Sequence, residues 1–322
     1  MVENPERVAS INQRWLVYVY AVVPVTILVV VADMALFGQA LQPYLTLSLL
    51  YLPLYIFVFE LPHIIASLTS FADREYVEHY RRELFVVLPI LIGAFALLSW
   101  YLFPVAVILY TCYTTYHVVR QQTGISLVLT KRRDNWHELW NHAGVVVGSS
   151  GMLVIFSKEF LGNFLLTPMS MVLFVSVVIF SVISLYIIYR TKPGLARWYV
   201  VAVWASVLAS FIFFVLNYLF LAIFVLRFVH DVTAFMFYIV HDMNRNLGEA
   251  HNVVYGALQH LKIPILVAVP AFAILVALGL RLSTNSLTAG IFVIMTVGIL
   301  HYYLESVMWK RTAPHRSHVN FS

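Results

Sequence analysis

The chain has 322 residues, of which 61% are hydrophobic and only 11% are charged, and its mean hydropathy is +0.86. Because soluble domains carry about 25% charged residues, this composition excludes an ordinary soluble protein and predicts one that crosses a membrane several times. The single cysteine excludes disulfides within the chain and cysteine-rich metal sites. The net charge of +5 comes from basic residues in short loops, so membrane topology explains it better than binding of nucleic acid.

Ten apolar runs follow a polar N-terminal segment of residues 1–13. The runs are 14–37, 44–70, 84–101, 103–128, 143–157, 169–189, 198–216, 218–243, 263–281 and 287–308. Since a helix needs about 20 residues to span a bilayer, they predict an all-α, polytopic transmembrane bundle of about ten helices. We expect one integral-membrane domain over residues 1–322, with a polar tail over 309–322 and a first run that remains as an anchor.

Some details of the runs affect how the helices pack. The turns between the third and fourth runs, and between the seventh and eighth, contain almost no charge, so sequence places those helix ends poorly. The short fifth run carries Gly144 and Gly148, four residues apart. This spacing allows helix backbones to approach closely and indicates packing, not chemistry.

Basic residues determine the expected orientation. If both termini are cytoplasmic, 16 Lys and Arg residues lie inside and only Lys158 and Arg281 lie outside. Cytoplasmic loops are generally enriched in Lys and Arg, so this bias favours an even number of spans in a multi-pass protein of the inner cell membrane. The two remaining basic residues, Arg120 and Arg227, fall within predicted helices.

Histidines inside the apolar runs are the main functional signal. Five of the 12 histidines lie there, all on even-numbered runs that cross in the same direction: His63, His117, His230, His241 and His301. A charged side chain in a membrane helix costs roughly 2.5–3.5 kcal/mol on insertion scales, so ionisable residues are rare there unless they serve a site. Imidazole is also a common ligand of iron, copper and zinc. The five residues therefore predict a metal site in the cytoplasmic half of the bundle.

Polar residues accompany these histidines at helical spacing. Three polar residues lie three or four positions from a histidine and so share its helix face. They are Glu60 before His63, Gln121 after His117 and Glu305 after His301. Glu60 and Glu305 are candidate catalytic residues, either as direct carboxylate ligands or as partners of a ligating ring. Sequence leaves the two roles open.

Two of the five histidines lie on one predicted helix. His230 and His241 are 11 residues apart, which is about 16 Å along an unbroken helix. Both bind one ion only if that helix bends or breaks; otherwise one of them supports the site without touching the metal. The remaining histidines that fall in loops or the tail are expected to be solvated: His79, His251, His260, His315 and His318.

The N-terminal half of this pattern resembles the bacterioopsin-related (Brp/Blh-type) membrane β-carotene 15,15′-dioxygenases. That family has a Leu-Pro-His run on an early helix, matched here by Leu61, Pro62 and His63. It also has a His-Phe-Gly segment on a middle helix, where this chain has Tyr116 and His117 without the glycine.

The C-terminal half continues the resemblance in the same order. The family's aromatic-x-His motif corresponds to Phe228 and His230, but Ala234 occupies the position of its second histidine, for which His241 is a displaced candidate. The family then has a histidine, an acid, a base and a Pro-His pair, matched in order by His301, Glu305, Lys310, Pro314 and His315.

The resemblance implies non-haem Fe(II) held by histidines. It also implies O₂-dependent cleavage of a carotenoid double bond to a retinal-like aldehyde. A lipophilic substrate of this kind would enter sideways from membrane lipid.

Other readings of the same residues stay open. A di-iron lipid hydroxylase or desaturase would also cluster histidines, although the usual His-x-x-His-His boxes are absent. A bis-histidine haem protein that transfers electrons would need only two of the five. A proton-coupled transporter would use His, Asp, Glu and Arg as relays, but no inverted repeat supports it. The sequence does not fix the metal, its nuclearity or the oligomeric state.

Overall fold

A computed structural model describes residues 8–45, 55–132, 134–157, 166–260, 263–283, 287–310 and 312–322. These residues are mostly helical, as predicted, and they form two compact units. The first unit comprises Met1–Asn12, Leu54–Leu102 and Asp231–Ser322, and the second comprises Gln13–Pro53 and Phe103–His230. One long helix, α11 (Leu219–Arg245), contributes its first half to the second unit and its second half to the first.

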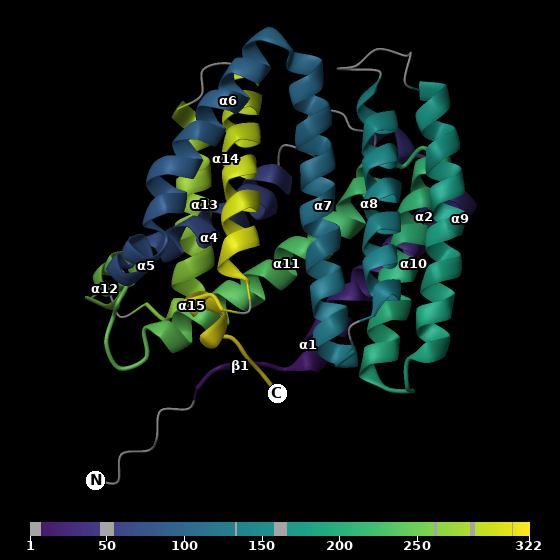
Figure 1. The fold of residues 1–322 in the computed structure, drawn as a ribbon. Coiled ribbons are helices and arrows are strands. Elements are labelled where there is room, and N and C mark those ends of the chain that lie inside the picture. Colours follow the sequence, from purple (N-terminus) through teal and green to yellow (C-terminus); the bar gives the residue numbers. More distant parts are fainter. Residues whose placement is uncertain are drawn as a thin grey trace. The chain divides into compact units, whose positions relative to one another are not determined.

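The second unit is built from long apolar helices. Its other helices are α1 (Gln13–Tyr18), α2 (Val22–Leu36), α7 (Phe103–Thr130), α8 (Asn135–Phe156), α9 (Leu166–Arg190) and α10 (Leu195–Val215). A 3₁₀ turn, η1 (Val19–Ala21), joins α1 to α2, and a second one, η2 (Gln42–Tyr44), follows α2. Helices α7, α8 and α9 run side by side, with α10 against α7 and α9 (Figure 1).

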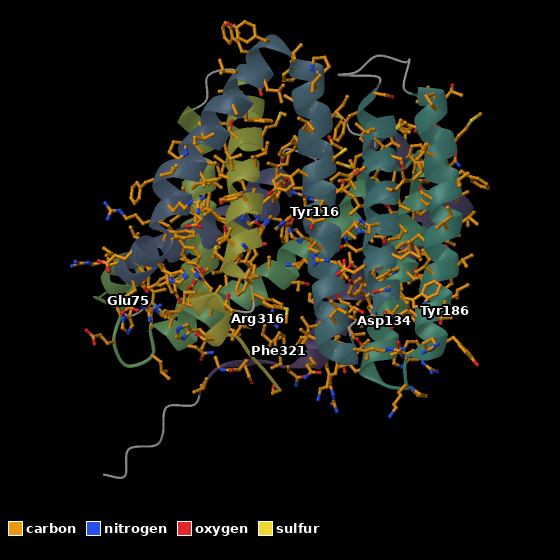
Figure 2. The ribbon with its side chains drawn as sticks, viewed as in Figure 1. Glu75, Tyr116, Asp134, Tyr186, Arg316 and Phe321 are labelled. Carbon is orange, nitrogen blue, oxygen red and sulfur yellow. The ribbon has the colours of Figure 1, made fainter. Side chains whose placement is uncertain are left out.

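Local chemistry sets the ends of these helices. Asp134 caps α8, since its side chain accepts a hydrogen bond from the backbone N–H of His137 (3.2 Å). Figure 2 labels Asp134 at this end, near Tyr186 of α9, whose ring contacts Trp136. The uncharged turn between α10 and α11 contains Asn217 with φ +63°, a left-handed conformation that a helix cannot continue through.

Glycines allow α8 to pack closely on α7, as the Gly144 and Gly148 spacing predicts. A Cβ atom added at Gly148 would clash with the side chain of Thr115, and one added at Gly144 would lie 2.9 Å from Val119 Cγ1. Gly124 of α7 differs, because an added Cβ there meets no atom within 4 Å.

We therefore expect Gly148→Ala to lower the free energy of unfolding by about 1–3 kcal/mol, the usual cost of overpacking. Gly124→Ala should leave it unchanged or raise it slightly, because alanine favours helix more than glycine does. Thermal unfolding of both variants in the same detergent measures the difference. Equal midpoints would contradict the close α7–α8 contact.

The first unit gathers the remaining helices and two very short strands. Its elements are β1 (Ser10–Ile11), η3 (Ile56–Glu60), α4 (Leu61–Thr69), η4 (Ser70–Ala72), α5 (Arg74–His79), η5 (Glu83–Val87), α6 (Leu88–Tyr101), α12 (Val253–His260), α13 (Ile265–Ser283), α14 (Leu287–Met308), α15 (Pro314–Ser317) and β2 (Asn320–Phe321). Helix α4 packs against α13 and α14, and α6 packs against α14 (Figure 1). The core here includes Leu61, Tyr76, Tyr238, Ala273 and Leu304.

Two π-helical turns in this unit have the same sequence cause. The turn η3 ends two residues before Pro62, and η5 ends two residues before Pro89. A proline inside a helix lacks an N–H and its ring clashes with the carbonyl four residues earlier, so the preceding turn widens. The widened turn η3 leads directly into the helix that carries His63.

The two ends of the chain meet in the first unit. Strands β1 and β2 pair in parallel, with Ser10 opposite Asn320 and Ile11 opposite Phe321. The side chain of Asn244 joins them, because it accepts from the Ala9 N–H (2.7 Å) and donates to the His318 carbonyl (2.7 Å). This pairing agrees with both ends lying on one side of the membrane. That the side is cytoplasmic stays a prediction, which a reporter fused after Ser322 would test.

The length and apolar composition of the helices are those of a membrane protein. Among the described residues, six helices are long and apolar enough to cross a bilayer: Gln13–Leu36, Glu83–Tyr101, Asn135–Phe156, Leu166–Arg190, Leu195–Val215 and Leu219–Arg245. Each of the ten predicted runs overlaps a helix, although residues 46–54 of the second run lie outside the described residues. The uncharged turn between the third and fourth runs falls at Leu102, between α6 and α7. A count of ten membrane crossings remains a prediction.

Candidate metal centre

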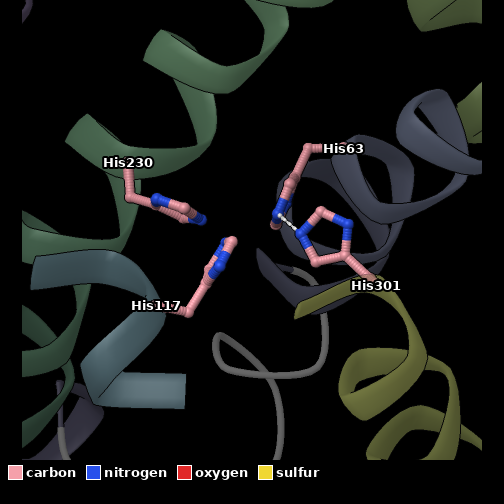
Figure 3. Close-up of side chains that lie close together, drawn as sticks. All are labelled: His63, His117, His230 and His301. Carbon is pink, nitrogen blue, oxygen red and sulfur yellow. Dashed lines mark hydrogen bonds between the residues drawn. The ribbon is translucent and has the colours of Figure 1, made fainter. Parts of the chain in front are cut away.

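Two predicted site residues meet in the first unit. His63 of α4 and His301 of α14 are both fully buried, and their Nε2 atoms lie 3.2 Å apart. Their ring centroids are 4.9 Å apart and the rings stand nearly perpendicular, at 79°. Figure 3 shows the Nε2 of each ring directed at the other. We call these two residues the first histidine pair.

The other nitrogen of each ring fixes where the ring proton lies. His63 Nδ1 lies 3.0 Å from Asp231 Oδ1, an ion-pair contact without hydrogen-bond geometry, and the negative charge there favours a proton on Nδ1. His301 Nδ1 is 2.7 Å from Ser67 Oγ, and that hydroxyl donates its only hydrogen to the Ile64 carbonyl (2.7 Å). Ser67 therefore accepts from His301 Nδ1. A histidine protonated on Nδ1 presents the lone pair of Nε2 to a metal, and the two Nε2 atoms also lie within hydrogen-bond distance, where the tautomers decide which one donates.

Acidic residues surround the first histidine pair. Asp231 is fully buried and also accepts a hydrogen bond from the Tyr55 hydroxyl. Glu305, predicted from its spacing, is buried with Oε1 4.0 Å from His301 Nε2. Glu60 is buried at the end of η3, three residues before His63. The first unit thus brings two imidazoles and the carboxylates of Asp231 and Glu305 to one buried region, where Oε1 of Glu305 lies 4.0 Å from His301 Nε2.

Two further predicted residues meet in the second unit. His117 of α7 and His230 of α11 are buried, with ring centroids 4.9 Å apart and rings at 84°. A ring nitrogen of each lies within 4.8 Å of the other (Figure 3). His230 Nδ1 donates to Gln121 Oε1 (2.7 Å), an oxygen that also accepts from Gln122 Nε2 (3.4 Å). The Nε2 of His230 therefore carries a lone pair as well. We call His117 and His230 the second histidine pair.

His241, the fifth predicted ligand, lies in a different cluster of the first unit. Its Nε2 is 2.9 Å from the Tyr76 hydroxyl and its Nδ1 is 2.8 Å from Asp242 Oδ1. Its ring stacks on His315, with centroids 4.9 Å apart and an interplanar angle of 14°. Both nitrogens are occupied by protein groups, so this histidine has the contacts of a packing residue.

The expectation that His315 is solvated is wrong. His315 of α15 is fully buried, and its ring stacks on Tyr76 with centroids 3.9 Å apart. Its Nδ1 lies 3.2 Å from the Tyr80 hydroxyl. A neutral imidazole is a flat ring that packs well between aromatic rings, so burial here is physically reasonable. His318, also expected to be solvated, is only half-buried, with its ring edge-on to His241. We call residues 312–322 the C-terminal tail.

Burial makes the docked tail sensitive to pH. Loss of solvation is the main reason that the pKa of His315 falls from 6.5 to about 2, and repulsion by the nearby His241 is the second. The same two causes lower the pKa of His318 to about 4. Both rings are neutral when docked but titrate near 6.5 when released, so docking is fully favoured above pH 6.5 and weakens as pH falls below it. We expect the protection of residues 312–322 against hydrogen exchange, taken relative to the intrinsic exchange rate at each pH, to fall between pH 7.5 and 5. Constant protection, or protection that rises as the pH falls, would contradict this sign.

Sequence reasoning anticipated some partners and missed others. Gln121 was expected on the face of His117, but it bonds His230 of another helix. Ser67 and Tyr55 gave no signal, because a hydroxyl on a helix face shows nothing about the helix it meets. Asp231 was visible only as a neighbour of His230, although it contacts His63.

Comparisons of the chain with protein-family models, with curated proteins and with solved structures give no match. The resemblance to the carotenoid-cleaving family therefore stays a prediction.

Proposed function

We infer that His63, His117, His230 and His301 together hold one non-haem iron, and that the chain is a membrane oxygenase acting on an apolar lipid. The observation that carries this inference is the first histidine pair, whose Nε2 atoms point at each other 3.2 Å apart inside the protein. With Nδ1 protonated on both rings, these two nitrogens would present their lone pairs to one cation.

The donor set suits a transition metal. Metal–nitrogen bonds are about 2.0–2.1 Å long, so two ligands of one ion lie up to about 4 Å apart, and 3.2 Å is within that reach. Ligating histidines usually donate their other N–H to a carboxylate or another oxygen acceptor. His63 has Asp231, His301 has Ser67 and His230 has Gln121 in this position. Neutral imidazoles without cysteine suit iron, copper or zinc.

The continuity of α11 supports joining the two pairs into one centre. His230 belongs to the second pair, and the next residue, Asp231, contacts His63 of the first. Consecutive Cα atoms are only about 3.8 Å apart, so one short piece of helix serves both pairs.

The proposed reaction is oxidative cleavage of a carotenoid to a retinal-like aldehyde, as the family resemblance implies. When bound, Fe(II) would supply the activation of O₂. The protein's own residues orient the ligands: Asp231 and Ser67 fix the ring tautomers, and burial of both pairs excludes water. Glu305 is placed to hold a proton or to complete the ligand set. A di-iron hydroxylase or desaturase is the nearest alternative.

A bis-histidine haem is the alternative from another class; two of these histidines would hold it, and it would supply electron transfer in place of oxygen activation. One haem needs only two imidazoles, so the number of buried histidines favours the non-haem iron.

Elemental analysis and a visible spectrum of the purified full chain test the proposal, followed by incubation with β-carotene and O₂. About one iron per chain, no Soret band and an aldehyde product are expected. A Soret band, or protein purified without a transition metal, would overturn it. Iron without any carotenoid product would favour hydroxylation or desaturation of another lipid.

A further inference from the structure

A large chamber lies within the second unit, lined by residues of α7, α8, α9, α10 and the first half of α11. It encloses a cavity of about 120 Å³. A single water needs only about 10–15 Å³ of such space, so this chamber has room for a ligand much larger than water. Its wall is mainly apolar and includes Val118, Ile155, Leu173, Phe180 and Val207. A surface of this kind fits a hydrocarbon.

One cation interrupts the apolar wall. Among the described residues that line the chamber, Arg227 is the only one with a charged side chain, and it is 7% exposed. Charged groups inside membrane proteins are costly and usually serve a site. A guanidinium has five N–H donors, so it can satisfy a protein partner and still donate to a ligand oxygen. It also matches the geometry of a carboxylate particularly well.

The chamber wall lies about one helical turn from the second histidine pair along each helix. Arg227 precedes His230 by three residues on α11, and Thr114 precedes His117 by three residues on α7. Residues three apart share a helix face. Since Arg227 and Thr114 line the chamber, the helix faces that form this part of its wall are the faces that carry His230 and His117 one turn further along.

We propose that this chamber binds an apolar chain that ends in a carboxylate or carbonyl oxygen, with that oxygen at Arg227. The chain lies along the apolar wall, and the oxygenated end lies within about one helical turn of His230. A fatty acid and the aldehyde formed by cleaving a polyene share this chemistry, whereas an uncleaved hydrocarbon lacks the oxygen. Taking the ligand as a substrate or product rests on the proposed function; the binding itself does not.

Photo-crosslinking of the full chain in lipid nanodiscs tests the proposal. The probe is palmitate with a diazirine in its chain, compared with an alkane that carries the same diazirine. We expect palmitate to label residues of the chamber, and Arg227→Gln to reduce that labelling at least about tenfold, as loss of a charge-assisted hydrogen bond predicts. Excess palmitate and excess retinal, added separately, then distinguish an acid from an aldehyde as the preferred ligand. Competition by either one supports the proposal.

A glycine provides a second variant. A Cβ added at Gly151 would meet only Leu173 Cδ1, at 3.6 Å, so a larger side chain there fills the chamber without backbone strain. We expect Gly151→Leu to abolish the labelling, while the matched Gly124→Leu on an open face of α7 leaves it unchanged. Equal labelling of these two variants, or equal labelling by palmitate and the alkane, would overturn the proposal.

Metal content measured in the same samples separates this proposal from the proposed function. If the chamber is labelled in protein that contains no metal, only the proposed oxygenase function is contradicted. If the protein contains iron but the chamber is not labelled, only the proposed binding site is contradicted.

Discussion

Replacing His63 or His117 with alanine should weaken metal binding at least about a hundredfold, more than the 10- to 100-fold usual for a residue that only supports a ligand. Each variant removes one imidazole from a different histidine pair, so the two together ask whether both pairs bind the same ion. Metal per chain, measured after dialysis against a weak chelator, is the readout. We expect both variants to purify with almost no iron.

Two exposed histidines supply matched controls for this prediction. His79 lies in the first unit and His142 in the second, and both side chains are exposed. His79→Ala and His142→Ala should keep the wild-type metal content. Loss of metal in His63→Ala alone would confine the site to the first unit, and equal metal content in all four variants would end the metal assignment. His315→Ala is unsuitable as a control, because that ring is buried beneath Tyr76.

The helices of this protein were predictable because their signal is local. An apolar run long enough to span a bilayer must satisfy its backbone hydrogen bonds internally, so composition alone indicates helix. Two helix boundaries lie in turns that carry almost no charge, so the sequence did not place them. The structure shows why the helices break there. Asn217 adopts a left-handed conformation after α10, and Leu102 precedes the proline-containing start of α7.

The candidate site was only partly predictable because its partners come from different helices. Histidines in apolar runs are rare enough to be noticed one at a time, and four of the five form the two pairs. Spacing along a helix shows which residues share a face, but it does not show which helix that face meets. His241 shares its helix with His230 and still belongs to another cluster, with Tyr76 and Asp242.

In the C-terminal tail the sequence led to a wrong prediction, because a residue expected to be solvated is buried. Its polar composition predicts solvation, and a helix as short as α15 is too brief for its apolar pattern to indicate a buried face. Burial of His315 depends on the rings of Tyr76 and Tyr80, more than 230 residues earlier in the chain. Only tertiary contacts of this kind distinguish a docked tail from a free one.

Asp231→Asn should lower metal affinity about 10- to 100-fold while leaving all four histidines in place. The carboxylate beside His63 Nδ1 favours a proton on that nitrogen, so the lone pair lies on Nε2, facing His301. An amide can present its N–H₂ group to the same ring, which favours the opposite tautomer and places the proton on Nε2, where it blocks a metal. A titration with Fe(II) or Co(II), followed by absorbance, gives the affinity.

Asp33→Asn is the matched control for this substitution, because Asp33 is also a fully buried aspartate that accepts a tyrosine hydroxyl, that of Tyr218, at 2.7 Å. Both variants lose one buried charge and keep nearly the same volume, so a general loss of stability would affect them alike. Only Asp231→Asn changes a group that touches a candidate ligand. If the two variants bind metal equally well, Asp231 does not set the tautomer of His63, and the proposed metal ligation through His63 Nε2 loses that support.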